Sequence, residues 1–236
     1  MINLAEELLE KYNNYNYQIY ITSGCFYSPG FNKHNRFSMR IDELCSNKNF
    51  QKIKKILMSE EDSVIVFNQR IQMYLEGFYF GRDESKWDYL FLSDKLNGEL
   101  DTDELIDEFK QLSTKNKVFL VYPTPELDFN PISKISNLIN KSKFKELNVS
   151  QEIKELGMEY YKFKSRSEKS INFFDKIESD LIFRIYPEDF LCDKINKKIC
   201  YVVKNNNVLY EDDNHLSNYG ASIIAKEIDR KIKIFE

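Results

Sequence analysis

Short apolar runs alternate along this chain with longer amphipathic segments. Four runs, several of them continuously apolar like strands covered on both faces, are residues 18–22, 63–67, 118–122 and 181–186. Between them, apolar side chains recur at helical spacing in the sets Leu4/Leu8/Tyr12, Leu105/Phe109/Leu112 and Ile171/Phe174/Ile177. This alternation of strands and helices predicts an α/β fold, a three-layer sandwich with a mostly parallel sheet.

Prolines follow the strand candidates and mark loops at their carboxyl ends. They are Pro123, Pro125, Pro131 and Pro187. Because ligands bind beyond the carboxyl ends of the strands in open parallel sheets, a site is expected near such loops. Residues 78–98, with Trp87, fit neither period and are interpreted as an excursion from the sheet. No repeat, low-complexity tract or linker interrupts the chain, so we predict a single domain over residues 1–236.

Composition and charge narrow the function classes. The 236 residues are enough for a packed core, and the formal charge of −4 is spread over interleaved acidic and basic residues. The absence of a basic block argues against a nucleic-acid partner. The sequence contains no run of about 18 apolar residues, so it predicts no membrane span. The acidic, amphipathic start is unlike a signal peptide, so we expect no export signal in the chain as written.

Four cysteines favour an oxidising compartment. Cys25 and Cys45 bracket one polar loop, and Cys192 and Cys200 bracket another, so each pair could close a local disulfide. Zinc is less favoured, because neither spacing matches the Cys-x-x-Cys knuckles of structural sites and the two histidines are poorly placed to join them. Four unrelated, reduced cysteines stay open as an alternative.

The strongest candidate chemistry is Asp212, three residues before His215. A tight turn brings two such side chains to one site, where a carboxylate can orient an imidazole that acts as a general base. Alternatively, Asp212 caps a backbone turn, or Asp213 takes its role. Ser217 is predicted to be the N-cap of a final helix, and Gly220 to allow close packing near its start. The core-facing stripe of that helix is predicted to be Ile223, Ile224, Ile228 and Ile232.

The wider string around this pair resembles one known family. Residues 185–192, Cys200 and residues 209–221 are similar to the end of the SGNH domain found at the carboxyl end of many bacterial membrane acyltransferases, which modify surface polysaccharides. In that family, a local cysteine pair precedes an aspartate, two residues, His-Leu-Ser, two residues and Gly-Ala. Earlier blocks match in the same order: residues 21–25 resemble the second strand with its loop cysteine, Cys45 the partner cysteine, residues 64–70 the third block and residues 118–125 the fourth strand.

The resemblance implies a flavodoxin-like fold of the SGNH hydrolase type and serine-based O-acyl transfer or deacylation, with no metal or other cofactor. It makes His215 the general base and Asp212 the residue that orients it. Asn68 matches the position of an oxyanion-stabilising asparagine, with a strand-ending asparagine as the alternative. Arg70 is a candidate for holding a sugar or an acceptor carboxylate, and an exposed salt bridge is the simpler interpretation.

The chain departs from the family at the nucleophile. The family's serine lies in a Gly-Asp-Ser motif after the first strand, and no Gly-Asp-Ser occurs in this sequence. Residues 1–13 look like the helix after that motif, so we expect an N-terminally truncated domain without the central first strand of a 2-1-3-4-5 sheet. The favoured explanation is a fragment or a misplaced or interrupted gene start, and the second is a non-catalytic relative. The weakest is a substitute nucleophile, Ser23 or Ser28, because both lie in a turn-rich segment.

Two function classes follow. One is an enzyme domain that acts on acylated bacterial cell-surface polysaccharide, beside an upstream membrane acyltransferase domain and in an extracytoplasmic location such as the periplasm. The other is a glycan-binding or structural pseudoenzyme, in which His215 only hydrogen-bonds its own loop. An unrelated cytosolic α/β binding protein with reduced cysteines has the least support. Transferase and esterase are not separated by sequence, since both pass through an acyl-enzyme.

Overall fold

The computed structural model describes residues 2–12, 18, 20, 25–35, 38–75, 89–93, 102–142 and 149–234. The chain forms two compact units, each of which is described by itself. The first unit comprises Met1–Ile19, Thr124–Ser167 and Ile185–Glu236, and the second comprises Tyr20–Pro123 and Glu168–Arg184. The prediction of one domain over the whole chain stays a prediction.

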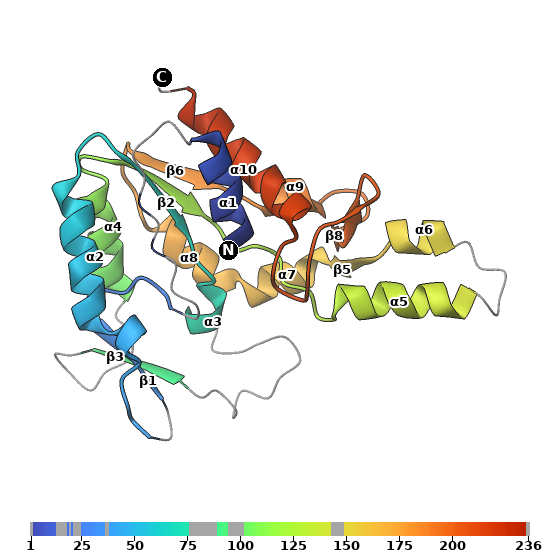
Figure 1. Cartoon of the computed structure of the whole chain (residues 1–236), viewed down its shortest axis with the longest axis horizontal. Helices are drawn as coiled ribbons and strands as arrows, with labels where there is room; N and C mark the ends of the chain where they lie inside the picture. The colour runs from blue at the N-terminus through green and yellow to red at the C-terminus, as the bar shows by residue number, and fades with distance from the viewer. Residues whose placement is uncertain are drawn as a thin grey trace. The chain divides into compact units, whose positions relative to one another are not determined.

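The second unit is built on a parallel sheet with the strand order β2-β4-β6. These strands are β2 Val64–Asn68, β4 Lys117–Val121 and β6 Ile182–Ile185 (Figure 1). Val64 pairs with Lys117, and the register continues to Asn68 opposite Val121. Three of the four predicted strands are therefore confirmed to within a residue or two. Of the fourth prediction, only residues 18 and 20 lie among the described residues.

Helices flank this sheet, as the alternating pattern predicts. They are α2 Asn47–Ser59, α3 Gln72–Leu75, α4 Thr102–Leu112 and α8 Glu168–Asp175. The predicted apolar face of α4 is fully buried at Leu105, Phe109 and Leu112. Phe174 of α8 is buried and Ile171 is half-buried. The α/β fold class is thus confirmed.

A separate two-stranded antiparallel sheet joins β1 Phe31–Asn35 to β3 Tyr89–Ser93. Strand β3 is the described part of residues 78–98, which the sequence places outside the parallel sheet. Its pairing with β1 agrees with that interpretation, and Trp87 lies outside the described residues. The short helix η1 Glu43–Cys45 follows β1, and its Cys45 forms a buried disulfide with Cys25.

An aromatic cluster packs three helices against strand β2. The ring of Phe67 in β2 lies 4.8 Å from that of Phe109 in α4, centroid to centroid, and 5.4 Å from that of Tyr27. Phe173 of α8 meets Phe109 edge-on at 6.2 Å, and Phe50 of α2 meets Tyr27 edge-on at 6.2 Å. Edge-on ring pairs add about 0.5–1.5 kcal/mol each beyond the area they bury. Three helices are therefore tied to one strand through contiguous rings.

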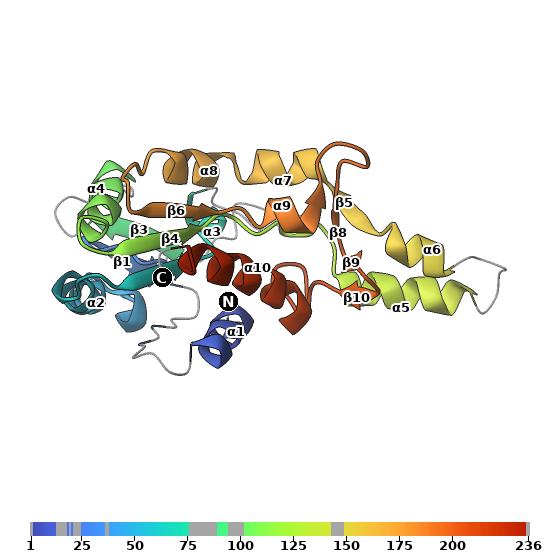
Figure 2. The ribbon, with the colours of Figure 1, turned by 90° about the horizontal axis from the view of Figure 1, so that it is seen from above.

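The first unit contains most of the remaining helices and short antiparallel strands. Its helices are α1 Ile2–Lys11, α5 Pro131–Ser142, α6 Val149–Lys154, α7 Tyr160–Arg166, α9 Glu188–Leu191 and α10 Asn218–Ile232. A three-stranded sheet has the order β5 Gly157–Glu159, β8 Ile199–Tyr201, β7 Cys192–Asp193, and β9 Val203–Lys204 pairs with β10 Asn207–Val208. Helices α5 and α6 lie side by side (Figure 2). None of the described helices combines the length and apolar character needed to cross a bilayer.

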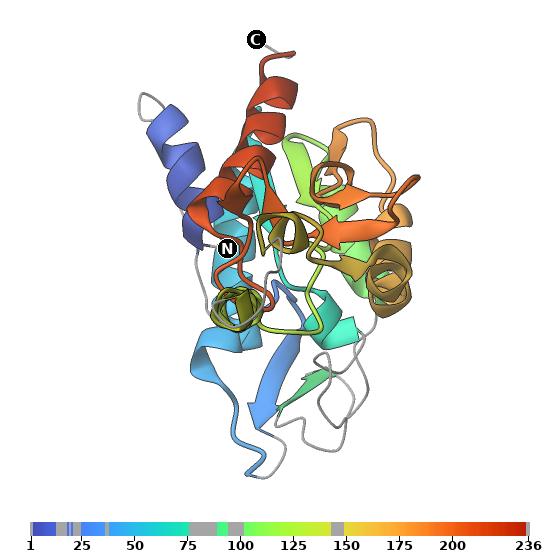
Figure 3. The same cartoon turned by 90° about the vertical axis from the view of Figure 1, so that its right-hand side faces the viewer.

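The predicted first and last helices, α1 and α10, pack against each other (Figure 3). The Tyr12 hydroxyl, just after α1, donates a hydrogen bond to Asp229 of α10 (2.9 Å), and Lys11 pairs with the same carboxylate (3.3 Å). The stripe predicted for α10 is partly wrong, because Ile223 and Ile232 are only half-buried. The buried face of α10 instead combines the predicted Ile224 and Ile228 with three small residues, Gly220, Ala221 and Ala225.

Both predicted disulfides are present. Cys25 pairs with Cys45, and Cys192 pairs with Cys200, so all four cysteines are engaged. Cys192 in β7 lies directly opposite Cys200 in β8, and the disulfide therefore joins two neighbouring strands. The alternatives of reduced cysteines and of a cysteine-bound zinc are wrong for this structure.

We predict that Phe109→Ala lowers the free energy of unfolding by about 3–5 kcal/mol, because it removes a fully buried ring and leaves a cavity. Urea unfolding followed by circular dichroism measures the change. The control is Leu44→Ala, at a side chain that is 62% exposed, with an expected change below about 0.5 kcal/mol. Equal losses in the two variants would contradict the role of the aromatic cluster.

Candidate functional site

The Asp212–His215 motif forms a closed turn between β10 and α10. Tyr210 and Leu216 form an antiparallel bridge at its base. Inside that bridge, the Glu211 N–H donates to the His215 carbonyl oxygen (2.8 Å). Backbone pairing therefore fixes the two ends of the turn. The side chains of Asp212 and His215 both project from this one short segment.

Asp212 uses its two carboxylate oxygens differently. Its Oδ1 accepts the backbone N–H groups of Asn214 (2.8 Å) and His215 (2.7 Å). Its Oδ2 lies 2.7 Å from Nδ1 of the His215 ring. The turn cap that the sequence offers for Asp212 is confirmed, and the same side chain also contacts the imidazole. Its role in orienting a general base stays a prediction.

The electrostatics of the turn fit an imidazole that acts as a base. Partial burial by itself raises the pKa of Asp212, but hydrogen bonds from Asn214 and His215 outweigh it and hold the pKa below its ordinary value. The ionised carboxylate therefore accepts a hydrogen bond from the Nδ1–H group of His215, which leaves the lone pair of the neutral ring on Nε2. The His215 side chain is 55% exposed, so a reactant can approach the ring.

Asp213, the competing carboxylate, is engaged elsewhere. Its Oδ1 accepts the side-chain amide of Asn214 (3.1 Å), and its backbone carbonyl accepts the N–H of Leu127 (2.7 Å). The second contact comes from a segment nearly ninety residues earlier in the chain. Asp212 is thus the carboxylate that contacts His215, and Asp213 anchors the turn through its backbone.

Ser217 and Gly220 fix the start of α10 against the turn. The Ser217 Oγ accepts the Gly220 N–H (3.2 Å), as predicted for an N-cap, and donates to the Val208 carbonyl (2.6 Å). A Cβ on Gly220 would lie 2.3 Å from the carbonyl oxygen of Leu209, so no side chain fits there. The predicted close packing at Gly220 is confirmed.

Helix α1 supports the same turn through a residue that sequence reasoning missed. The side-chain amide of Asn3 donates to Oε1 of Glu211 (3.0 Å) and to the Leu216 carbonyl oxygen (2.8 Å). Nothing in the local pattern around Asn3 indicates this contact, because its partners lie more than two hundred residues away.

The other predicted site residues belong to the second unit. Asn68 ends β2 and Arg70 follows two residues later, and both are half-buried. Their predicted roles stay predictions. Ser28 is fully buried and its Oγ donates to the Phe26 carbonyl oxygen (3.0 Å), which is the behaviour of a turn residue and gives no support to a nucleophile. Ser23 lies outside the described residues.

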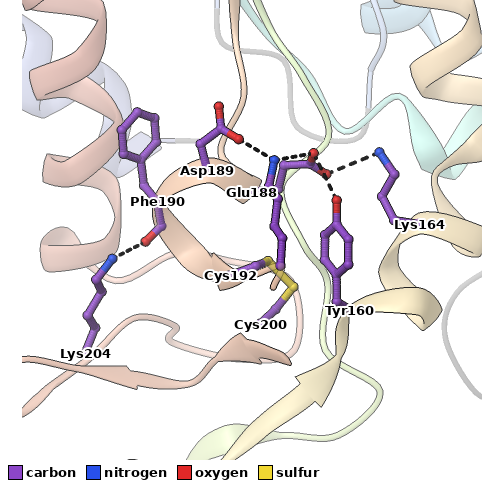
Figure 4. Close-up of a disulfide and its surroundings, with 9 residues drawn as sticks. Tyr160, Lys164, Glu188, Asp189, Phe190, Cys192, Cys200 and Lys204 are labelled. Atoms are coloured by element: carbon purple, nitrogen blue, oxygen red, sulfur yellow. Dashed lines mark hydrogen bonds and ion pairs between the residues drawn. A yellow bond between two sulfur atoms is a disulfide. The ribbon is translucent and has the colours of Figure 1, made fainter. Parts of the chain in front are cut away.

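The Cys192–Cys200 disulfide is surrounded by paired charges (Figure 4). Glu188 accepts hydrogen bonds from the Tyr160 hydroxyl (3.2 Å), Lys164 (3.4 Å) and Lys194 (2.8 Å). Partial burial alone would lower the pKa of Lys194, but hydrogen bonds to Asp189 and Glu188 raise it to about 12. These cations are neutralised by their neighbours, so the cluster fits a structural brace for the β7–β8 pair.

Metal ligation is not indicated in the part of the chain that the structure describes. No group of three or more His, Cys, Asp and Glu side chains is arranged there to hold an ion.

Comparisons with known proteins agree with the fold class. The model of one protein family, the SGNH domain (fused to AT3 domains), matches residues 2–230. A solved structure, the periplasmic domain of a lipopolysaccharide acetyltransferase from Salmonella ser. Paratyphi A, superposes with a TM-score of 0.52. The two are 19% identical, over 98% of this chain and 78% of that one. No curated protein sequence is similar enough to count as a match. At this identity, the structural likeness supports the fold alone.

The lowered pKa of Asp212 predicts how stability depends on pH. Asp212 has an ordinary value of 3.8 in the unfolded chain and titrates at lower pH in the folded chain. Its ionisation therefore stabilises the fold fully above that ordinary value, and the stabilisation is lost as pH falls through the folded-state pKa. We expect the free energy of unfolding of the native chain to exceed that of Asp212→Asn at neutral pH.

The difference between the two proteins should shrink as the pH falls below about 4. Urea unfolding of both proteins at a series of pH values measures it. A difference that stays constant or grows on acidification would show that Asp212 is not held in its charged form by the turn.

Proposed function

The chain belongs to the family of SGNH domains that are fused to AT3 domains, and from that premise we propose that it is an O-acyl-transfer domain with a Ser-His-Asp mechanism. The observation that carries the proposal is the 2.7 Å contact between Oδ2 of Asp212 and Nδ1 of His215. The second oxygen of Asp212 is fixed by two backbone N–H groups, so the carboxylate is held in place before any substrate arrives.

His215 is the general base in this proposal. Its Nε2 takes the proton of a serine hydroxyl as the serine oxygen attacks the acyl carbonyl carbon, and Asp212 stabilises the imidazolium that forms. The imidazolium then returns the proton to the departing alcohol, and an acyl-serine is left. A sugar hydroxyl or water completes the reaction, which makes the domain a transferase or an esterase.

We assign supporting roles to two residues of the second unit. The side-chain amide of Asn68, at the carboxyl end of β2, donates to the oxyanion of the tetrahedral intermediate. Arg70 binds a sugar or an acceptor carboxylate. Support for both roles comes from their place at the end of a strand of the parallel sheet, where α/β folds bind ligands.

The proposed substrate is an acylated bacterial cell-surface polysaccharide, and the proposed location is extracytoplasmic. The two disulfides support an oxidising compartment. The family description supports an AT3 membrane acyltransferase as the partner domain. The similar Salmonella domain, which is periplasmic and belongs to a lipopolysaccharide acetyltransferase, supports both the place and the type of substrate.

The nucleophile in this proposal comes from a Gly-Asp-Ser block outside the 236 residues, since the sequence contains no such motif. We further propose that the two compact units act as one SGNH domain, because a single family model spans residues 2–230. The missing motif also favours a second candidate function, a glycan-binding or structural pseudoenzyme that keeps the turn only for its fold.

We predict that an extended protein, with a strand ending in Gly-Asp-Ser placed before Met1, releases acetate from an aryl acetate ester. His215→Ala should lower the rate at least about 100-fold, because the general base is lost. Release of the aryl alcohol, followed by absorbance, measures the rate. His34→Ala is the matched control, since His34 is the other histidine of the chain and its ring contacts the Met39 carbonyl oxygen.

An extended protein that is folded and inert with several acyl donors would overturn the enzymatic proposal. Glycan binding by the chain alone, unaffected by His215→Ala, would then favour the pseudoenzyme.

The extracytoplasmic location has its own test. We expect no free thiol when the chain is recovered from the periplasm of its natural host and titrated under denaturing, non-reducing conditions, because all four cysteines are paired. Four free thiols in that material would contradict the disulfides, and absence of the chain from the periplasmic fraction would contradict the proposed location.

A further inference from the structure

We propose that the buried ion pair Glu126–Arg166 positions the His215 ring, acting through the backbone of Leu127. The inference rests on the proposed function for the role of His215, but its test measures the ring itself. Glu126 and Arg166 touch none of the reacting groups in this account, so they are positioning residues rather than catalytic ones.

The ion pair is a rigid anchor. Nε and Nη2 of Arg166 lie 3.0 Å and 2.5 Å from Oε2 of Glu126. The two side chains are 3% and 5% exposed, so both charges are taken out of water. Removing one partner of a buried ion pair takes a counter-charge from the other, which is strongly unfavourable. Glu126 is thereby held against Arg166, the last residue of α7.

The anchor connects directly to the turn. The N–H of Leu127 donates to the Asp213 carbonyl oxygen (2.7 Å), between Asp212 and His215 in the sequence. That N–H belongs to the peptide bond that joins Glu126 to Leu127, and the peptide unit is planar. The N–H therefore turns only together with that plane, whose rotation is limited when the side chains on either side of it, Glu126 and Leu127, are both held. Leu127 is itself fully buried, so this segment is held from both sides.

The charge of the same carboxylate also acts on the base of the turn. Tyr210, which is 1% exposed, begins the bridge that closes the turn. Burial raises the pKa of its hydroxyl, and the charge of Glu126 raises it further. The positioning proposed here rests on the hydrogen bond from Leu127 to Asp213, and the charge at Tyr210 agrees with it.

The chain supplies a matched control. Lys162 and Asp128 form an ion pair of 2.8 Å between the same two segments, two to four residues away from the buried pair. Their side chains are 36% and 29% exposed, and ion pairs in contact with water contribute little. Loss of that pair should leave the turn unchanged, so comparison of the two pairs separates positioning from a general link between the segments.

The test is nitrogen NMR of the imidazole rings in the whole chain, which has two histidines. His34→Gln assigns the signals. In the native chain, the neutral His215 ring should carry its proton on Nδ1. In the double variant Glu126→Gln/Arg166→Met, which removes both charges of the pair together, we expect loss of that tautomer preference and at least about 10-fold faster amide exchange at Leu127. Asp128→Asn/Lys162→Gln should change neither.

The His215 tautomer of the single variant Glu126→Gln is compared with that of the native chain when the circular dichroism spectra of the two proteins match. If the single variant does not fold, the double variant provides the test. A folded double variant with an unchanged His215 tautomer and unchanged exchange at Leu127 would overturn the inference. A merely structural role would lower the unfolding midpoint without moving the tautomer at temperatures well below it. Absence of acyl transfer by the extended protein would overturn the proposed function and leave this result standing.

Discussion

The candidate site depends on one constraint: the carboxylate of Asp212 hydrogen-bonds the backbone of the turn and the imidazole of His215 at the same time. Oδ1 of Asp212 accepts hydrogen bonds from two backbone N–H groups of the turn, and Oδ2 accepts one from Nδ1 of His215. Because the backbone bonds fix the plane of the carboxylate, they also fix the direction from which the ring can approach. The base is therefore oriented by the same bonds that close the turn.

Segments that are far apart in the sequence hold the Asp212–His215 turn in place. Asn3 reaches it from α1, Leu127 from the segment after β4, and Leu209 lies so close to Gly220 that a side chain is excluded. Each contact is a hydrogen bond or a close packing contact made to backbone atoms. The geometry of the site is thus a property of the folded unit, although the residues that do the proposed chemistry are three positions apart.

This division explains what the sequence predicts and what it misses. Features with a local pattern are predictable. The Ser217 cap and the Asp-x-x-His spacing arise within a few residues, the cysteine pairs span 20 and 8 positions, and the continuously apolar strands mark burial on both faces. The contacts of Asn3 and Leu127 are not, because a long-range hydrogen bond to a backbone carbonyl leaves no local pattern. A related reason explains why Ile223 and Ile232 of α10 are only half-buried. Helical periodicity marks which positions are apolar, but the neighbouring elements decide which of those positions are covered.

The contact between α1 and α10 has a consequence for the order in which the protein can fold. Tyr12 and Asp229, which are hydrogen-bonded, are separated by 217 positions in the sequence. On the ribosome, α1 is synthesised more than two hundred residues before its partner α10. Contacts of such high sequence separation slow folding, because the chain must close a large loop before the contact gains anything. The unit that carries His215 is therefore expected to become native only after α10 has been made, and a nascent chain that ends before α10 has no formed site.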